Sequence, residues 1–247
     1  MKDGPGRAAE RSERSVRIVV DRVILEGDLA IPETARGIVV FVHGSGSSRF
    51  SSRNRYVAQY LRQDGLATLL FDLLTRQEEE IDTYTMKLRF DIGLLARRLS
   101  GVTRWLAAQA ETRNLAVGYF GASTGAAAAL IAETENSAAV KAIVARGGRP
   151  DLAAAALGQV QAPTLLIVGG NDYQVILLNE QAMDRLPGPK RMVIVPGATH
   201  LFEEPGALEQ AANLASQWFR RYLIGSPAGR GDEARQAQAV AGDSPAR

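Results

Sequence analysis

Short runs of apolar residues, many of them β-branched, alternate along the chain with longer segments in which apolar residues recur every three or four positions. The short runs are typical of buried strands and the longer segments of helices. This alternation predicts an α/β fold with a mostly parallel central sheet of about eight strands and helices on both faces. The predicted strands lie within residues 16–20, 23–31, 37–44, 66–72, 115–121, 140–148, 163–172 and 190–200.

Helices are predicted between most of these strands. The expected helical segments are 53–64 (ended by Gly65), 88–109, 123–133, 175–186 and 205–223. The segment 73–87 is polar and acidic, and we expect it to be a long loop in which Glu78 to Glu80 form a solvated face. Only one helix and its loops fit between residues 148 and 163, so we predict no cap domain over the sheet.

The ends of the chain differ from its centre. Residues 1–15 and 226–247 are charged and rich in Gly, Pro and Ala, without periodic apolar positions. We expect both segments to be disordered, flanking a single domain over residues 16–225.

Composition and charge exclude several classes of protein. No apolar run approaches the roughly 20 residues that span a bilayer, and the first residues lack the apolar core of a signal peptide. The net charge is only +2, with arginines dispersed among acids. We therefore expect a cytoplasmic protein that binds neither membrane nor nucleic acid.

The reactive side chains are few. The chain has no cysteine, which excludes thiolate nucleophiles and thiolate metal sites, and only two histidines, His43 and His200. No carboxylates or histidines are grouped at ligand spacing, so no metal or other cofactor is expected.

The segment GASTG, residues 121–125, matches the G-x-S-x-G pattern directly after a predicted strand and directly before a predicted helix. In that context the pattern predicts a tight turn that lifts the hydroxyl of Ser123 above the sheet edge as a nucleophile. The alternative is that Ser123 is only the N-cap of the helix.

Two further residues follow strand ends in an informative order. Asp172 comes directly after a strand and His200 lies in the loop after the last strand. Taken alone, Asp172 would be a helix cap and His200 a surface residue. The order Ser123, Asp172, His200 is, however, the chain order of an α/β-hydrolase triad.

A Gly/Ser loop, HGSGSSR at 43–49, follows an early strand. Such a loop can aim a backbone N–H at the position of a tetrahedral oxyanion, so we expect the amides of Ser45 and Thr124 to be the two donors. The loop fits neither nucleotide-binding glycine fingerprint. His43 is expected to brace this loop, because a triad needs only one histidine as base.

On these motifs, from the His-Gly loop to PGATHLFEEPGALE at 196–209, the chain resembles the α/β-hydrolases. It is similar to the dienelactone-hydrolase-like group, which includes hydrolase domains fused to phosphoribosyltransferases in some bacterial proteins. The resemblance implies the fold, the triad roles and an ester-like substrate, and it alone implies association with a phosphoribosyltransferase. Dienelactone hydrolases use cysteine as nucleophile, whereas position 123 is serine, which favours a serine esterase.

The sequence thus predicts a serine hydrolase that cleaves small carboxylic esters or lactones through an acyl-enzyme. Two alternatives remain open: an acyl or thioester transferase with the same triad, and a non-catalytic ligand-binding module on the same fold. Arg146 and Arg149 follow a predicted strand and are candidates for binding a substrate carboxylate. Their alternative role is an internal ion pair with Asp151, Glu203 or Glu204.

Overall fold

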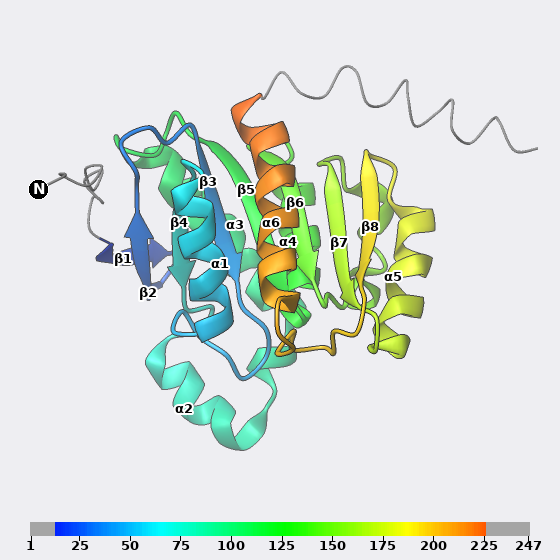
Figure 1. Cartoon of the computed structure of the whole chain (residues 1–247). Helices are drawn as coiled ribbons and strands as arrows, with labels where there is room; N and C mark the ends of the chain where they lie inside the picture. Colours follow the sequence, from blue (N-terminus) through cyan, green and yellow to red (C-terminus); the bar gives the residue numbers. More distant parts are fainter. Residues whose placement is uncertain (1–12, 226–247) are drawn as a thin grey trace, which may run out of the picture.

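The computed structural model describes residues 13–225 (Figure 1). These residues form one eight-stranded sheet in the order β1-β2-β4-β3-β5-β6-β7-β8. The strands are β1 Arg14–Val20, β2 Val23–Ala30, β3 Gly37–Val42, β4 Ala67–Phe71, β5 Ala116–Ala122, β6 Val140–Arg146, β7 Thr164–Gly169 and β8 Lys190–Val195.

The first two strands form an antiparallel hairpin, and β2 also pairs with β4 in the antiparallel direction. The strands β3, β4, β5, β6, β7 and β8 are mutually parallel, so their carboxyl ends meet at one edge of the sheet. The predicted α/β fold and its mostly parallel sheet are confirmed.

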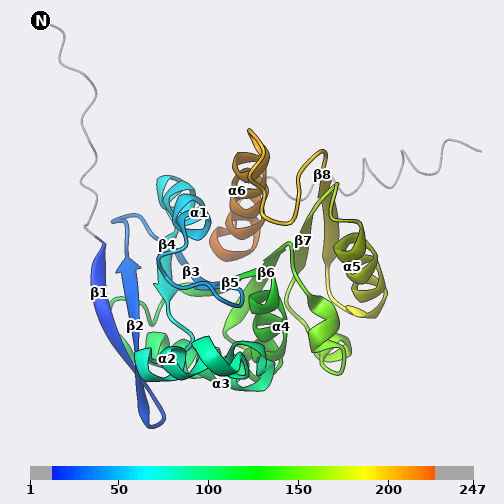
Figure 2. The ribbon, with the colours of Figure 1, turned by 90° about the horizontal axis from the view of Figure 1, so that it is seen from below.

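The helices are α1 Ser52–Gln63, α2 Arg76–Thr85, α3 Ile92–Ala108, α4 Thr124–Asn136, α5 Tyr173–Arg185 and α6 Ala207–Phe219. Helices α1 and α6 cover one face of the sheet, and α3, α4 and α5 cover the other (Figure 2). Alternate residues of the central strands supply the two cores: Val39 and Phe41 pack towards α1 and α6, whereas Val40 and Val42 pack towards α3 and α4. None of the helices within residues 13–225 is long and apolar enough to span a membrane.

The prediction of a loop at 73–87 is wrong, because this segment contains α2. The helix begins with a capping box: the Thr75 hydroxyl accepts from the Glu78 amide, and the Glu78 carboxylate accepts from the Thr75 amide. Glu78 also binds Arg98 of α3 at 2.6 Å, so it is a structural residue rather than part of a solvated face. Helix α2 projects at the edge where the parallel strands end (Figure 1).

Several boundaries also differ from the prediction. Strand β1 begins at Arg14, within the segment expected to be disordered, and the remaining predictions for 1–12 and 226–247 lie outside the described residues. The third helix begins at Ile92, where the Asp91 carboxylate caps it, and is preceded by a 3₁₀ turn at Leu88–Phe90. Between β6 and β7 the chain forms only two 3₁₀ turns, Pro150–Ala153 and Leu157–Gln159.

Candidate active site

Ser123 lies in a sharp turn between β5 and α4. Its φ of 51° and ψ of −122° are unusual for a residue with a side chain, and such strained backbone is concentrated at functional sites. It occupies the N-cap position of α4, but its side chain makes no capping hydrogen bond. A Cβ on Gly125 would lie 2.1 Å from the carbonyl oxygen of Val42, so glycine is required for α4 to begin this close to β3. The turn therefore exposes the Ser123 hydroxyl and does not use it as a cap.

The three residues predicted from their chain order come together in the structure. Nε2 of His200 lies 3.3 Å from Oγ of Ser123, and Nδ1 of His200 lies 2.6 Å from Oδ2 of Asp172. Asp172 occupies the N-cap position of α5 but makes no capping bond, because its carboxylate binds the imidazole. With Nδ1–H donating to the carboxylate, Nε2 is free to accept the serine proton.

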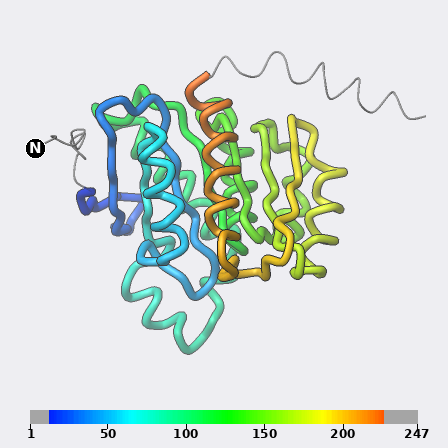
Figure 3. The backbone as a smooth tube through the Cα atoms, in the orientation of Figure 1, coloured from blue at the N-terminus to red at the C-terminus, as the bar shows by residue number. Residues whose placement is uncertain are grey.

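The loop that carries His200 is tied to the β7–α5 turn. The chain runs from β8 into α6 along the edge where the strands end (Figure 3). The Asn171 amide donates to the Ala198 carbonyl, and the Asn171 side chain donates to the Gly197 carbonyl, both at 2.9 Å. These bonds fix the segment that carries the imidazole to the segment that carries the carboxylate.

The loop at 43–49 lies against the nucleophile turn. A Cβ on Gly44 would lie 3.1 Å from Cβ of Ser123, which shows how closely the two segments approach. Thr124 is the first residue of α4, so its amide has no acceptor within the helix. The Ser45 amide, however, donates to Oγ1 of Thr124 at 2.9 Å. In this structure the buried Thr124 hydroxyl is therefore the acceptor for this amide, and the role of the Ser45 and Thr124 amides as oxyanion donors stays a prediction.

His43 braces the loop as predicted. Its Nδ1 bonds the Gly44 carbonyl at 3.0 Å, and its Nε2 accepts from the Leu73 amide at 3.2 Å. Burial lowers the pKa of His43, which keeps the ring neutral and able to accept at Nε2. The ring thus links the loop after β3 to the segment after β4.

Arg49 is a second brace that the sequence reading did not identify. Its backbone amide donates to Asp72 Oδ1 at 2.7 Å, and its guanidinium pairs with Asp72 and with Glu26, the latter at 2.9 Å. The available signal was the carboxylate of Asp72 directly after a strand, beside a loop that contains one arginine.

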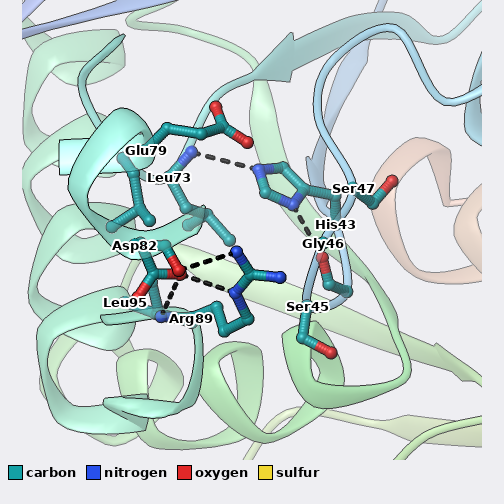
Figure 4. Close-up of a pocket in the computed structure, with 11 residues that line it drawn as sticks. His43, Ser45, Gly46, Ser47, Leu73, Glu79, Asp82, Arg89 and Leu95 are labelled. Atoms are coloured by element: carbon teal, nitrogen blue, oxygen red, sulfur yellow. Dashed lines mark hydrogen bonds and ion pairs between the residues drawn. The ribbon is translucent and has the colours of Figure 1, made fainter. Parts of the chain in front are cut away.

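A cavity of about 20 Å³ lies between this loop and α2 (Figure 4). It can hold about one water molecule. Arg89 lines it with its guanidinium held by the buried Asp82: Nε donates to the carboxylate at 2.6 Å and Nη2 to the backbone carbonyl at 3.0 Å. The cavity is too small to receive more than a small group.

The two candidate arginines have different environments. Arg149 forms a two-pronged pair with Asp151, at 2.8 and 2.7 Å, as its alternative role predicted. Arg146 has no such pair within residues 13–225: only 6% of it is exposed, and neither Nε nor Nη1 has a hydrogen-bond partner there. The alternative of an internal pair is thus right for Arg149 and wrong for Arg146.

The fold and the order of these residues along the chain are those of an α/β-hydrolase. The chain belongs to the dienelactone hydrolase family, whose model matches residues 25–223.

The chain is similar to several individual proteins. A crystal structure of dienelactone hydrolase from Anabaena variabilis is 61% identical, with a TM-score of 0.85, and the match covers 86% of this chain and 98% of that one. "Putative phosphoribosyl transferase Rv0571c" of Mycobacterium tuberculosis is 57% identical over 86% of this chain. The match covers 47% of that protein, so the chain spans about half its length. Est1E from Butyrivibrio proteoclasticus with bound ferulic acid is 13% identical, with 85% and 100% of the two chains covered and a TM-score of 0.73, and shares the fold.

Proposed function

We propose that the protein is a serine hydrolase that cleaves small carboxylic esters or lactones through an acyl-enzyme intermediate. The observation that carries the proposal is the hydrogen-bonded series from Ser123 through His200 to Asp172 at the carboxyl edge of the sheet. Each member follows the end of a different strand. Ser123 and Asp172 make no helix-capping bond, and His200 hydrogen-bonds to both of them.

The first half of the reaction acylates Ser123. His200 Nε2 takes the hydroxyl proton as Oγ attacks the carbonyl carbon, and Asp172 stabilises the imidazolium that forms. The C–O bond to the leaving group then breaks, and His200 returns the proton to the leaving oxygen. In the second half His200 deprotonates a water molecule as it attacks the acyl carbonyl. The bond from the acyl carbon to Oγ then breaks, and His200 returns the proton to Oγ of Ser123, which releases the acid.

The oxyanion of each tetrahedral intermediate is held by the amides of Thr124 and Ser45. Because the Thr124 hydroxyl accepts from the Ser45 amide at 2.9 Å, it stands about where an oxyanion bound to that amide would stand. We propose that the Thr124 hydroxyl rotates away about χ1 when the substrate binds. The Ser45 amide then donates to the oxyanion instead of to the hydroxyl.

Several features favour a small substrate. Only two short 3₁₀ turns connect β6 to β7, which leaves no room for a cap domain between these strands. The relative from Anabaena is named a dienelactone hydrolase, and the Est1E structure holds ferulic acid. Ser123 stands where dienelactone hydrolases use cysteine, which favours a serine esterase.

The curated relatives suggest a setting for this activity. They are about twice as long as the matched region and are named phosphoribosyl transferases. We propose that a hydrolase unit of this kind works beside a phosphoribosyltransferase in the cytoplasm. A pull-down with this chain that recovers no phosphoribosyltransferase would count against the association, and it would leave the esterase proposal untouched.

A panel of short 4-nitrophenyl esters and small lactones tests the activity on wild type beside Ser123→Ala. We expect turnover by wild type and a loss of at least about 10³-fold in the variant. Added alcohols or amines distinguish a transferase, which would form new esters or amides in preference to free acid. Turnover that persists in Ser123→Ala would refute the mechanism. No turnover across the panel, together with a rise in Tm on addition of panel compounds, would favour the ligand-binding module.

A further inference from the structure

Two adjacent glutamates follow His200 in the same loop, and their carboxylates have different partners. Oε2 of Glu204 accepts a hydrogen bond from the backbone amide of Thr199 at 3.0 Å. Oε1 of Glu203 instead accepts from the guanidinium of Arg53, on helix α1, at 3.1 Å. Thr199 directly precedes His200. The Glu204 carboxylate therefore holds the backbone next to the imidazole, whereas the Glu203 carboxylate binds a neighbouring helix.

The backbone around His200 forms a tight turn. The Phe202 amide donates to the Thr199 carbonyl at 3.2 Å, which makes His200 and Leu201 the two central residues of a β-turn. Phe202 then has a left-handed backbone conformation, with φ of 56°, and its side chain is buried. Such a conformation is costly for a bulky residue and persists only where the surrounding contacts hold it. The turn that carries the imidazole thus depends on how its ends are held.

Glu204 connects this turn to helix α6. Its backbone carbonyl accepts at 3.0 Å from the amide of Ala207, the first residue of α6, and the proline that follows it limits its backbone conformations. The carboxylate therefore reaches back to Thr199 from a backbone that is itself fixed. Hydrogen bonding from Thr199 lowers the pKa of Glu204, so the acceptor is ionised at neutral pH and the hydrogen bond is charge-assisted.

The segment that carries His200 is held at both ends. On the side nearer β8, Asn171 ties it to the β7–α5 turn. On the side nearer α6, Glu204 ties it to the start of that helix. Nε2 of His200 lies 3.3 Å from Oγ of Ser123, at the long end of the hydrogen-bonding range. A small displacement of the turn therefore separates the base from the nucleophile, and misplacement by about 1 Å can cost about 10²-fold in rate.

We infer that Glu204 is a positioning residue for the reaction, because its carboxylate holds the turn that presents Nε2 of His200 to Ser123. The inference rests on the proposed function, since it concerns how the general base of that function is placed. It gives Glu204 no contact with the substrate and Glu203 no part in positioning. A carboxylate with a merely structural role would change the stability and leave the reactivity of the folded protein unchanged.

Substitutions at the two glutamates test the inference. Glu204→Ala removes the acceptor, Glu204→Gln keeps an uncharged oxygen that can accept, and Glu203→Ala is the control at the neighbouring position. For wild type and each variant, kcat and KM are measured with a short 4-nitrophenyl ester, and the rate of labelling of Ser123 by a fluorophosphonate is measured per folded molecule.

We expect Glu204→Ala to lower both kcat and the labelling rate about 10-fold. The KM should stay within about threefold of wild type, because His200 acts in both halves of the reaction and both halves slow together. Glu204→Gln should recover the rates to within about threefold of wild type, and Glu203→Ala to within about twofold, since an uncharged acceptor is weaker than a carboxylate and Glu203 does not hold the turn. Unchanged rates in Glu204→Ala, an equal loss in Glu203→Ala, or a loss confined to KM would overturn the inference.

A spectroscopic signal separates this inference from the proposed function. The proton on Nδ1 of His200, hydrogen-bonded to Asp172, is followed by NMR and assigned by its loss in His200→Gln. We expect its signal to broaden or shift in Glu204→Ala and to match wild type in Glu203→Ala. If wild type cleaves no ester, the proposed function fails, whereas this signal still decides whether Glu204 places the imidazole, and an unchanged signal overturns the inference. If Glu204→Ala does not fold, Glu204→Gln is compared with Glu203→Gln, and equal labelling rates and equal signals in the two overturn it.

Discussion

The most quantitative prediction concerns His43, which joins the loop after β3 to the segment after β4. Replacing it with leucine keeps a side chain of comparable size but removes both ring nitrogens. The Leu73 amide then loses its acceptor, which costs about 1–3 kcal/mol for a buried donor, and the bond from Nδ1 to the Gly44 carbonyl is lost at about 1 kcal/mol. We therefore expect His43→Leu to lower the free energy of unfolding by about 2–4 kcal/mol, a large part of the 5–15 kcal/mol of a typical domain.

The loss should depend on pH in a defined direction. Burial holds the pKa of His43 in the folded state below the ordinary value of 6.5, so the unfolded chain binds the proton more readily. The stabilisation by the neutral ring is complete above pH 6.5 and declines as pH falls below that value. The difference between wild type and His43→Leu should thus be largest at pH 8 and smaller at pH 5, because all other titrating groups are common to both proteins.

Urea denaturation of wild type and His43→Leu at pH 8 and pH 5 measures this difference in the free energy of unfolding. Leu73→Ala is not a suitable control, because it also changes the core. A difference below about 0.5 kcal/mol at pH 8, or one that grows at pH 5, would refute the assignment of His43 as a neutral brace.

Three further predictions concern the nucleophile turn and its partners. Gly125→Ala should destabilise the fold by about 1–3 kcal/mol or more, because the new Cβ would lie 2.1 Å from a backbone oxygen. In the same denaturation assay the control Gly158→Ala, whose new Cβ has nothing within 4 Å, should change the stability by less than about 0.5 kcal/mol. Asp172→Asn should keep the fold, checked by circular dichroism, and lower kcat for esters by about 10⁴-fold, since an amide does not stabilise the imidazolium or its working tautomer; a loss below tenfold would contradict this role. Thr124→Val removes the hydroxyl that accepts from Ser45 and should leave kcat/KM within about tenfold of wild type, whereas a 10²-fold loss would identify the hydroxyl as an oxyanion donor.

The sheet and the three reactive residues were predictable because their signals are local. Buried parallel strands appear as apolar runs, and the carboxyl end of each run places the following residue at one edge. The chain order and the strand ends are enough to predict that three side chains meet at this edge: Ser123, Asp172 and His200. Helix α2 differs from the prediction because its acidic composition is typical of a loop, whereas the local signal that indicates a helix is the Thr75-x-x-Glu78 capping pattern.

The remaining differences depend on contacts that sequence spacing does not encode. The Ser45 amide donates to the Thr124 hydroxyl because that side chain, 79 positions along the chain, has one particular rotamer. Arg146 and Arg149 are three residues apart and similar in context, yet one points under the loop that carries Phe202 and the other reaches Asp151. Which arginine is paired depends on the direction of each side chain after folding, and no pattern in the sequence gives that direction.

The central claim is that Ser123 is the nucleophile, and covalent labelling with a fluorophosphonate tests it most directly. Intact-protein mass and peptide mapping are measured for wild type, for Ser123→Ala and for Asp172→Asn. The account predicts a single adduct on the peptide containing Ser123, no adduct in Ser123→Ala and slower labelling in Asp172→Asn. Labelling of another residue at the same rate in Ser123→Ala, or no labelling of the folded wild-type protein, would contradict it.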